Sequence, residues 1–577
     1  MPVARHSAAC VRRRNGGRDM QANDFSQLLE QLAGSERDAH RYRDNGSVTE
    51  LSYGELVAEA DRVARGMHRL GARRGDRVGL VLHRAQDFVP AFLGCVRAGF
   101  IAVPLFPPLT LGQLASWSET TERMLTTAGA SLLLADPPVA YTLRTLPDRI
   151  PSLRDVVSMS ELPEGGELRY GAASEGDVVF LQFTSGSTSA PRGVRVTHGS
   201  LWANAHAIMV DGLSASPEDR GVSWLPLFHD MGLIGFVMAP LVTRTPVTFI
   251  STLDFLKRPE AWVRTLSEDR GTISFAPNFG YALTARRTAS TDGLDLSAVR
   301  VLGCGAEPIQ PEAIHSFFER FGEAGLEPSA FLACYGMAET TLAVTFAGMD
   351  DELRVDQLAL EADASDEDGP RLHRLERRVP VVSCGRALPR HRVSILGADG
   401  EPVPDGGLGE VFVQGPSVTD GYWDDEEATS RVFVDGGVKT GDLGYLSEGE
   451  LYVTGRLKDT IIVRGRNYDP TPIEVAAGRV RGVRKGNVAA FAVSEANTER
   501  IVVAAEHREG EPGAIESAIV RAVQREVGLT VSEVVLIEAG SLPKTTSGKL
   551  QRSATRDQYL EGRLGLVRRR TDASAVA

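Results

Sequence analysis

The segment QFTSGSTSAPRGVRVTH, residues 182–198, gathers small hydroxyl residues and glycine into one loop. Six of the seven residues from Thr184 to Ala190 are serine, threonine or glycine, and the apolar run DVVFLQF before them predicts a buried strand. Glycine lets the main chain approach an anion, and successive amide and hydroxyl groups donate hydrogen bonds to it. Arg192 would add positive charge. The loop therefore predicts a phosphate site, with a flexible Ser/Gly linker as the alternative; the P-loop sequence GxxxxGK(S/T) is absent.

Four further stretches have residues that suit nucleotide chemistry. They are GCGAEPI (303–309), CYGMAETT (334–341), KTGDLGYL (439–446) and LPKTTSGKLQR (542–552). Together with the hydroxyl-rich loop, and in this order, they resemble the motifs of the adenylate-forming superfamily, which includes acyl-CoA synthetases, peptide-synthetase adenylation domains and luciferases. The resemblance covers nearly everything from about residue 25 to 560. It implies that the chain joins a carboxylate to the α-phosphate of ATP and releases pyrophosphate.

The resemblance also implies a nucleotide site and a set of catalytic residues. Those implied to bind ATP are Thr184, Ser185, Gly186, Ser187, Thr188, Arg192, Gly305, Ala306, Glu307, Pro308, Cys334, Tyr335, Gly336, Met337, Ala338, Asp442, Arg456 and Lys549. Those implied to be catalytic are Lys549, His229, Glu339 and Thr184.

Each implied role suits its residue type. Glu339 and Thr184 would help hold Mg²⁺, which prefers carboxylate and phosphate oxygens. Asp442 would accept hydrogen bonds from the ribose hydroxyls, with Arg456 nearby. Lys549 would reach the acyl carboxylate and the α-phosphate during adenylation. Taken one at a time, Glu339 could instead be a helix cap, Asp442 a turn residue and Lys549 a solvated charge.

The residue after Phe228 bears on which acid is activated. Peptide-synthetase adenylation domains need an aspartate there, because a buried ammonium group needs a charged partner. Here His229 follows Phe228 and Asp230 comes one place late. His229 is similar to the residue near the acyl carboxylate in acyl-CoA synthetases and fatty-acyl-AMP ligases; a surface turn histidine is the alternative. The residues implied to contact the acid are Trp224, Phe228, His229, Met231, Phe279, Gly303 and Met337.

The stretches WLPLFHDMGLIG, APNFGYAL and IIVRGRN resemble the fatty-acyl-AMP ligases in particular. That subfamily transfers the acyl group to the phosphopantetheine thiol of a carrier protein, here acting in trans, and coenzyme A is the alternative acceptor. The acid could be a straight fatty chain or a bulkier natural-product carboxylate. Three positions depart from the family pattern: Arg192 replaces lysine, Ser189 replaces glycine, and Asp469 stands where tyrosine is expected.

Fatty-acyl-AMP ligases also have an extra segment after the position of Glu339, and the highly charged stretch 350–380 lies in that place. Its composition predicts an insertion or long surface loop without a clear strand. We expect it to pack on the large domain near the path of the small one. The apolar residues available for that packing are Leu353, Val355, Leu358, Leu360 and Leu372.

Helical and strand patterns alternate from about residue 50 and predict an α/β fold of βαβ units with mainly parallel sheets. We expect a large N-terminal domain of such sheets with flanking helices, and a small mobile C-terminal α+β domain. The expected divisions are a disordered tail at 1–22, the adenylation domain at 23–457, the small domain with the catalytic lysine at 458–563 and a disordered tail at 564–577. The hinge is expected at Lys458.

Composition narrows the function classes. A net charge of −13 argues against a nucleic-acid binder, which needs clustered Lys and Arg. The five cysteines are scattered without CxxC spacing, which argues against a disulfide framework or zinc site and suits a reducing cytoplasm. No apolar run approaches the ~18 residues that span a bilayer. Met20 is an alternative start, because recognisable structure begins after it.

The role implied for Lys549 gives a first prediction. Its ammonium group should stabilise charge only while the adenylate forms. Lys549→Ala should therefore lower acyl-AMP formation about 100-fold or more, the scale of losing one well-placed charge stabiliser. Transfer of the acyl group from preformed acyl-AMP should continue, and the two half-reactions can be timed separately. Equal losses in both would contradict the role.

Overall fold

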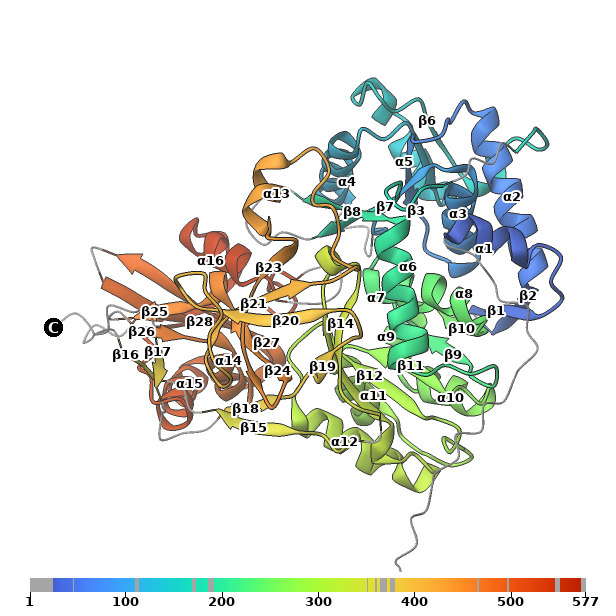
Figure 1. Cartoon of the computed structure of the whole chain (residues 1–577). Helices are drawn as coiled ribbons and strands as arrows, with labels where there is room; N and C mark the ends of the chain where they lie inside the picture. The colour runs from blue at the N-terminus through green and yellow to red at the C-terminus, as the bar shows by residue number, and fades with distance from the viewer. Residues whose placement is uncertain are drawn as a thin grey trace, which may run out of the picture.

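The structure is a computed structural model. It describes residues 24–571 except 45, 109–113, 169–172, 185–190, 350, 359–360, 364–370, 374–378, 464–465, 496–497 and 545–549. The prediction for residues 1–22 lies outside the described residues. Among those described, no helix is both long and apolar enough to cross a membrane. Figure 1 shows the larger part of the chain, from blue through yellow to light orange, beside a smaller part coloured darker orange to red.

The first βαβ units build a six-stranded sheet in the described chain. Its order is β6 (Asp155–Val157), β5 (Leu132–Ala135), β3 (Arg77–Val81), β4 (Ile101–Pro104), β7 (Val178–Thr184) and β8 (Arg192–Thr197). Neighbours are parallel except β7 and β8, which form an antiparallel hairpin. One face packs against α2 (Tyr53–Arg69) and α3 (Ala85–Ala98), the other against α4 (Leu114–Ala128) and α5 (Pro137–Leu143).

The local signals in this region explain where its helices begin and end. Ser52 Oγ accepts a hydrogen bond from the Glu55 amide, and the Glu55 carboxylate accepts one from the Ser52 amide at 2.8 Å. This capping box starts α2. Helix α3 ends at Gly99, whose φ of 70° is left-handed and favours glycine.

A second, nine-stranded sheet forms the centre of the larger part. Its order is β19 (Arg386–Ala387), β14 (Ala343–Phe346), β13 (Phe331–Gly336), β12 (Val301–Cys304), β11 (Ile273–Ala276), β9 (Gly221–Ser223), β10 (Val247–Ile250), β1 (Asp38–Asp44) and β2 (Ser47–Ser52). The strands from β13 to β1 are parallel, as the sequence predicts, and the edges are antiparallel.

Helical segments of this region join the same apolar core as the sheets. They are α1 (Phe25–Leu32), α6 (His198–His206), the π-helix η4 (Ala207–Gly212), α7 (Asp230–Leu233), the π-helix η5 (Ile234–Met238), α8 (Ala239–Thr243), α9 (Thr252–Lys257), α10 (Glu260–Glu268), α11 (Asn278–Arg287) and α12 (Pro311–Phe321). Short 3-10 turns include η8 (Ala338–Thr340).

A five-stranded antiparallel sheet leads out of the larger part. It contains β20 (Arg392–Leu396), β21 (Gly409–Gln414), β22 (Phe433–Val434), β23 (Gly437–Ser447) and β24 (Glu450–Arg456), with α13 (Glu426–Val432) before β22. The 3-10 turn η9 (Leu457–Asp459) follows β24 directly.

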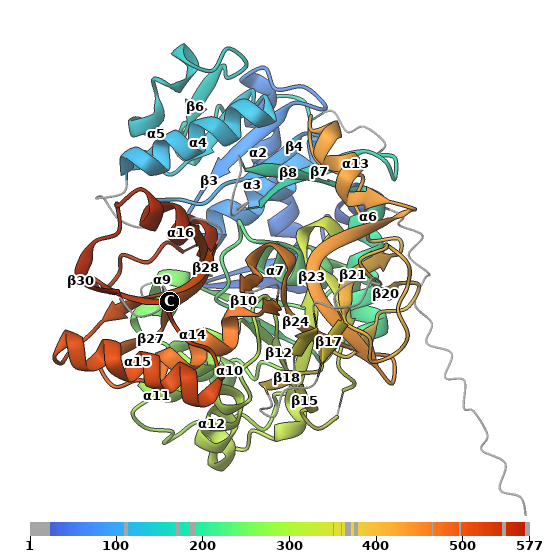
Figure 2. The ribbon, with the colours of Figure 1, turned by 90° about the vertical axis from the view of Figure 1, so that its left-hand side faces the viewer.

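The chain after η9 has apolar clusters of its own. Two clusters draw only on residues 461–564, whereas the other described clusters end by Val453. The elements here are β25 (Ile461–Val463), β26 (Arg466–Tyr468), α14 (Pro470–Gly478), β27 (Val483–Glu495), β28 (Thr498–His507), α15 (Pro512–Glu526), β29 (Glu533–Ile537), α16 (Arg552–Leu560) and β30 (Leu566–Thr571). Figure 2, which turns this smaller part toward the viewer, shows it lying over the middle of the larger one.

The prediction of a disordered tail from residue 564 is wrong for residues 564–571. Leu566–Thr571 form β30, which pairs antiparallel with β29, and Leu564 is buried in an apolar cluster. Main-chain hydrogen bonds make this pairing, so three consecutive arginines do not prevent it. A side-chain pattern alone cannot reveal such an edge strand.

The expectation that residues 350–380 contain no clear strand is also wrong. β15 (Val355–Leu358) pairs with β18 (Val379–Val382), and β16 (Glu361–Asp363) pairs with β17 (Arg371–His373). Leu353 and Val355 pack against the large apolar core as predicted, whereas the side chains of Leu358, Leu360 and Leu372 lie outside the described part. We call residues 350–380 the charged insertion.

The charged insertion is fixed at its base by polar contacts. Tyr445 Oη donates to Asp356 Oδ2 at 2.7 Å, and Arg354 Nη1 lies 2.6 Å from Glu450 Oε1. Ser383 Oγ donates to the other oxygen of Glu450 at 2.7 Å. Farther out, β16 lies against β26 of the smaller part. The insertion therefore touches both parts of the molecule.

Arg552 holds the smaller part to the end of the connecting turn. Its guanidinium makes a forked contact with Glu474 at 2.7 and 2.8 Å and reaches Asp459 Oδ2 at 2.9 Å. All three side chains are mostly buried, with 19%, 9% and 10% exposed. The network joins α16, α14 and η9.

We predict that Arg552→Met lowers the free energy of unfolding of the smaller part by about 3 kcal/mol, because it leaves two buried carboxylates without their cation. Urea unfolding followed by circular dichroism measures the change. Arg563→Met is the matched control, since Arg563 pairs with Glu561 while two-thirds exposed. Equal stability of the two variants would contradict the prediction.

Candidate active site

One large cleft, of about 3380 Å³, receives side chains from both parts of the molecule. The residues selected from the sequence that line it are Thr184, Arg192, Trp224, Phe228, His229, Met231, Phe279, Ala306, Glu307, Pro308, Cys334, Tyr335, Gly336, Met337, Ala338, Glu339, Asp442, Arg456 and Lys458. Gly303 and Gly305 do not line it. Ser185, Gly186, Ser187, Thr188 and Lys549 lie outside the described residues.

The phosphate loop predicted from the sequence connects the two strands of a hairpin. Thr184 ends β7, Arg192 begins β8, and the two residues pair across the ladder. The Arg192 guanidinium lies 5.4 Å from the centre of the Tyr422 ring, and its Nε lies 3.3 Å from Asp425 Oδ2. These contacts hold the Arg192 cation in place at the start of β8, where the loop ends.

Glu339 lies in the same cluster. Tyr422 Oη donates to Glu339 Oε1 at 2.8 Å, while Tyr422 itself is only 7% exposed. Trp423 N donates to Gly193 O at 2.8 Å, which joins this segment to β8. Burial raises the pKa of Glu339, and the hydrogen bond from Tyr422 opposes that rise. Glu339 also lines the cleft, where its carboxylate can meet a bound cation.

Among the described residues, no cluster of three or more His, Cys, Asp or Glu side chains could hold a metal ion. Mg²⁺ commonly binds through one or two carboxylates together with substrate phosphates. Glu339 and Thr184 both line the cleft, and this carboxylate and hydroxyl fit that mode.

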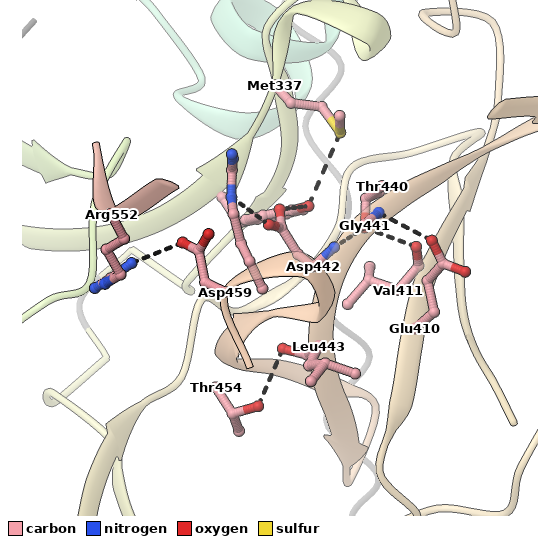
Figure 3. Close-up of polar contacts among 12 residues, drawn as sticks. Met337, Glu410, Val411, Thr440, Gly441, Asp442, Leu443, Thr454, Asp459 and Arg552 are labelled. Carbon is pink, nitrogen blue, oxygen red and sulfur yellow. Dashed lines mark hydrogen bonds and ion pairs between the residues drawn. The ribbon is translucent and has the colours of Figure 1, made fainter. Parts of the chain in front are cut away.

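Asp442 is held from two strands (Figure 3). Tyr335 Oη donates to Asp442 Oδ2 at 2.7 Å, and Arg456 Nε lies 2.9 Å from Oδ1. The Asp442 side chain is 7% exposed, and its charge raises the pKa of Arg456. Its amide donates to Thr440 Oγ1 at 3.1 Å. The carboxylate is fixed in the cleft wall and retains acceptor capacity for hydroxyl groups.

The segment after β12 is shaped by close packing. A methyl on Gly305 would lie 2.7 Å from Cys334 Sγ, so only glycine fits there. Ala306 follows with a left-handed φ of 69°. Glu307 Oε1 accepts a hydrogen bond from the Phe279 amide at 2.6 Å. Gly305 therefore has a packing role, and the next three residues form the cleft surface.

His229 is oriented by its neighbour. His229 Nδ1 lies 2.5 Å from Asp230 Oδ1, and the Met231 amide donates to the same oxygen at 2.7 Å. An Nδ1–H that donates to a carboxylate leaves Nε2 as the free ring nitrogen. Gln182 Nε2 donates to Phe228 O at 3.0 Å and holds the preceding residue.

The residues predicted to contact the acid differ in how far they are accessible from the cleft. Trp224 is only 2% exposed and stacks on Phe255 with the ring centres 3.6 Å apart, so it is mainly core. Gly303 is buried, and a methyl there would lie 2.0 Å from the Phe275 ring. Phe275 lines the cleft instead. The prediction that Gly303 contacts the acid is therefore wrong, because an aromatic ring covers it.

Lys458 lines the cleft between the two parts. Asp469, which stands where the family pattern has tyrosine, lines it too. Burial lowers the pKa of Lys458, and the adjacent Arg456 lowers it further. Asp469 Oδ1 accepts a hydrogen bond from the Thr471 amide at 2.9 Å and caps α14. Burial raises the pKa of Asp469 to about 6.

Sequence reasoning missed Tyr422, Asp425 and Gln182, which hold Glu339, Arg192 and Phe228. The signal for Tyr422 was the aromatic pair Tyr422-Trp423 after a glycine within an acidic stretch. Gln182 was visible as a polar residue inside an apolar strand.

Comparison with known proteins assigns the chain that forms this cleft to a family. Residues 29–423 match the family described as "AMP-binding enzyme". Residues 458–569 match the family described as "Disco-interacting protein 2-like, AMP domain".

Whole-chain relatives agree. A Caulobacter vibrioides protein provisionally named an acyl-CoA synthetase is 37% identical over 94% of this chain and 96% of its own. The medium-chain-fatty-acid–[acyl-carrier-protein] ligase JamA of Moorena producens is 34% identical over 94% and 97%. A solved structure from a study of fatty acyl-adenylate ligases of E. coli and L. pneumophila is 35% identical with a TM-score of 0.86, covering 93% of this chain and 98% of that chain.

The contact between Tyr422 and Glu339 gives a prediction about pH. If ionised Glu339 binds the cation, activity should fall as the pH drops through its raised pKa. Tyr422→Phe removes a donor that favours the carboxylate, so the pKa should rise further and the acid limb of the rate profile should move to higher pH. Pyrophosphate release measured against pH tests this.

Glu339→Gln should also raise the Mg²⁺ concentration required.

Tyr445→Phe is the matched control. The Tyr445 hydroxyl donates a hydrogen bond to Asp356 over 2.7 Å, and Tyr445 does not line the cleft. It should leave the acid limb in place. A profile that Tyr422→Phe does not shift would mean that the hydrogen bond serves only structure.

Proposed function

Since the chain belongs to the AMP-binding enzyme family and is like its fatty-acyl-AMP ligases, we propose that it activates a fatty or other apolar carboxylic acid as acyl-AMP and transfers the acyl group to a carrier protein. A carboxylate oxygen attacks the α-phosphorus of ATP, and the bond to the bridging oxygen of pyrophosphate breaks. A phosphopantetheine thiol then loses its proton and attacks the acyl carbon, and AMP leaves.

The convergence of separate segments on one cleft supports this function. Arg192 and Thr184 come from the β7–β8 hairpin, Glu339 from η8 and Asp442 from β23, and all line the same space. His229 lines it from the start of α7. A cation beside a hydroxyl-rich loop, a carboxylate that can accept from hydroxyl groups and many apolar side chains therefore line one cleft.

Each group has a role that its contacts suit. Arg192 and the loop after Thr184 bind the terminal phosphates, and Asp442 accepts hydrogen bonds from the ribose hydroxyls. His229, with Nδ1 directed at Asp230, would donate an Nε2–H to the acid carboxylate as the imidazolium, in which both ring nitrogens are donors. Mg²⁺, when bound through Glu339 and phosphate oxygens, shields the negative charge of the reacting groups.

We place the domain boundary at Lys458, with residues 458–571 moving as one unit, because Leu564 and β30 pack and pair within the smaller part. The separate apolar clusters after residue 461 support this division. The ion pairs of Arg552 with Asp459 and Glu474 would make the unit rigid up to the hinge. Lys549, three residues before Arg552 in the chain, would then enter or leave the cleft with the whole unit.

The charged insertion supports the carrier-protein acceptor over coenzyme A. Its base is anchored at Glu450, and β16 lies against β26 of the smaller part. An insertion that contacts both parts can bias how they sit relative to each other. A bias of about 1.4 kcal/mol changes such a population tenfold. The acyl-CoA synthetase alternative is favoured by the name of the Caulobacter relative.

The function is tested by pyrophosphate release over a panel of carboxylic acids, followed by acyl transfer to coenzyme A and to a phosphopantetheinylated carrier protein. We expect release with apolar acids and transfer mainly to the carrier protein. Absence of acid-dependent pyrophosphate release would contradict adenylation. Rapid acyl-CoA formation would contradict the choice of acceptor.

The insertion can be removed without breaking its base. Leu358 and Val379 pair across β15 and β18, so an Asn-Gly turn can replace residues 359–378. We predict that this variant keeps acyl-AMP formation and raises acyl-CoA formation about tenfold. The adenylation rate of the same variant is the internal control. No gain in acyl-CoA would contradict the proposed role.

A further inference from the structure

One glycine beside the acid-binding residues has no structural need to be glycine. Residues 230–243 form a continuous helical run in which α7 is followed by the π-helix η5 and then α8. Pro240 lacks an amide hydrogen, so the regular hydrogen-bond ladder cannot continue through it. The π-helical segment comes just before this residue, and such segments occur often at functional sites.

Gly235 differs from its neighbours in exposure. From residue 231 to 240 every residue is buried except Gly235, which is partly accessible and lines the cleft. Its accessible side therefore faces the cleft. Glycine is a poor helix former, and a helix interior gains nothing from it unless space or backbone geometry requires it.

Neither requirement applies at Gly235. Its φ is not left-handed, and a methyl group there would have Leu342 Cδ2, at 3.7 Å, as its nearest neighbour. By contrast, a methyl on Gly303 would lie 2.0 Å from the Phe275 ring, and one on Gly212 would lie 2.8 Å from the Phe346 ring. Aromatic rings fill the space beside those two glycines, whereas the space beside Gly235 is open.

The space beside Gly235 is apolar, and Gly235 follows His229 along the same helical run. Gly235 comes six positions after His229, which is about 9 Å along a helix at 1.5 Å per residue. The cleft is bordered on this side by apolar residues, namely Ile208, Met209, Leu213, Phe275, Leu342 and Phe346. A ligand whose carboxylate lies near His229 would pass Gly235 with its hydrocarbon chain.

We propose that Gly235 determines acyl-chain specificity, because its missing side chain leaves the passage through which the chain of a linear carboxylic acid extends. This inference rests on the proposed acid-activating function. Acids too short to reach Gly235 do not depend on the passage, whereas long chains do.

The test compares butanoate with hexadecanoate in pyrophosphate release. Gly235→Leu should lower kcat/KM for hexadecanoate about 100-fold relative to butanoate, the scale of losing a few buried methylene groups. Gly235→Ala should shift the ratio in the same direction by about tenfold, the scale of one methyl group in an apolar pocket. The alanine variant also provides the test if the leucine variant does not fold.

Gly322→Leu is the matched control, since Gly322 has nothing within 4 Å of its Cβ position and does not line the cleft. It should leave the ratio unchanged. A Gly235 variant that loses activity equally with both acids, or keeps the original ratio, would overturn the proposal.

Calorimetric binding of hexadecanoate without ATP separates this inference from the proposed function. Loss of binding in Gly235→Leu supports the passage even if wild-type protein releases no pyrophosphate, a result that would refute adenylation alone. Equal binding of hexadecanoate by wild-type protein and Gly235→Leu would overturn the passage.

Discussion

A buried carboxylate fixes the geometry of the cleft. Removing the Asp442 charge from water costs several kcal/mol unless partners compensate it. Tyr335, from the nine-stranded sheet, and Arg456, from the end of β24, supply that compensation. The contact therefore joins two sheets at the wall of the cleft. Because Arg456 comes two residues before Lys458, the same contact also fixes the position at which the chain leaves the larger part.

The same principle recurs on both sides of this anchor. Glu339 is held by Tyr422, whose ring also carries the Arg192 cation. In the smaller part, Arg552 satisfies two mostly buried carboxylates at once. In each of these three places, the buried charged group has a partner from a different element. Such pairs add little net stability, but they fix orientation, because breaking one leaves an unpaired charge.

The glycines around the cleft are of two kinds: some have no room for a side chain, and one borders open space in the cleft. Gly303 and Gly305 are required because Phe275 and Cys334 occupy the space of a side chain. Gly235 faces unfilled space in the cleft. All three look alike in the sequence, where a glycine within an apolar stretch carries no sign of what lies beside it. Only the positions of residues far along the chain distinguish them, and this is why the sequence misassigned Gly303 to the acid site.

The sequence by itself determined the alternation of helices and strands in the larger part and the chemistry. Local signals such as the Ser52–Glu55 capping box act within one turn, and alternating helices and strands imply parallel sheets, so both could be predicted. The order of the motifs was enough to indicate adenylation. Tertiary structure decided the partners: that Tyr422 reaches Glu339, and that the arginine-rich segment after Leu564 becomes an edge strand. These depend on long-range contacts and main-chain pairing, which side-chain patterns do not encode.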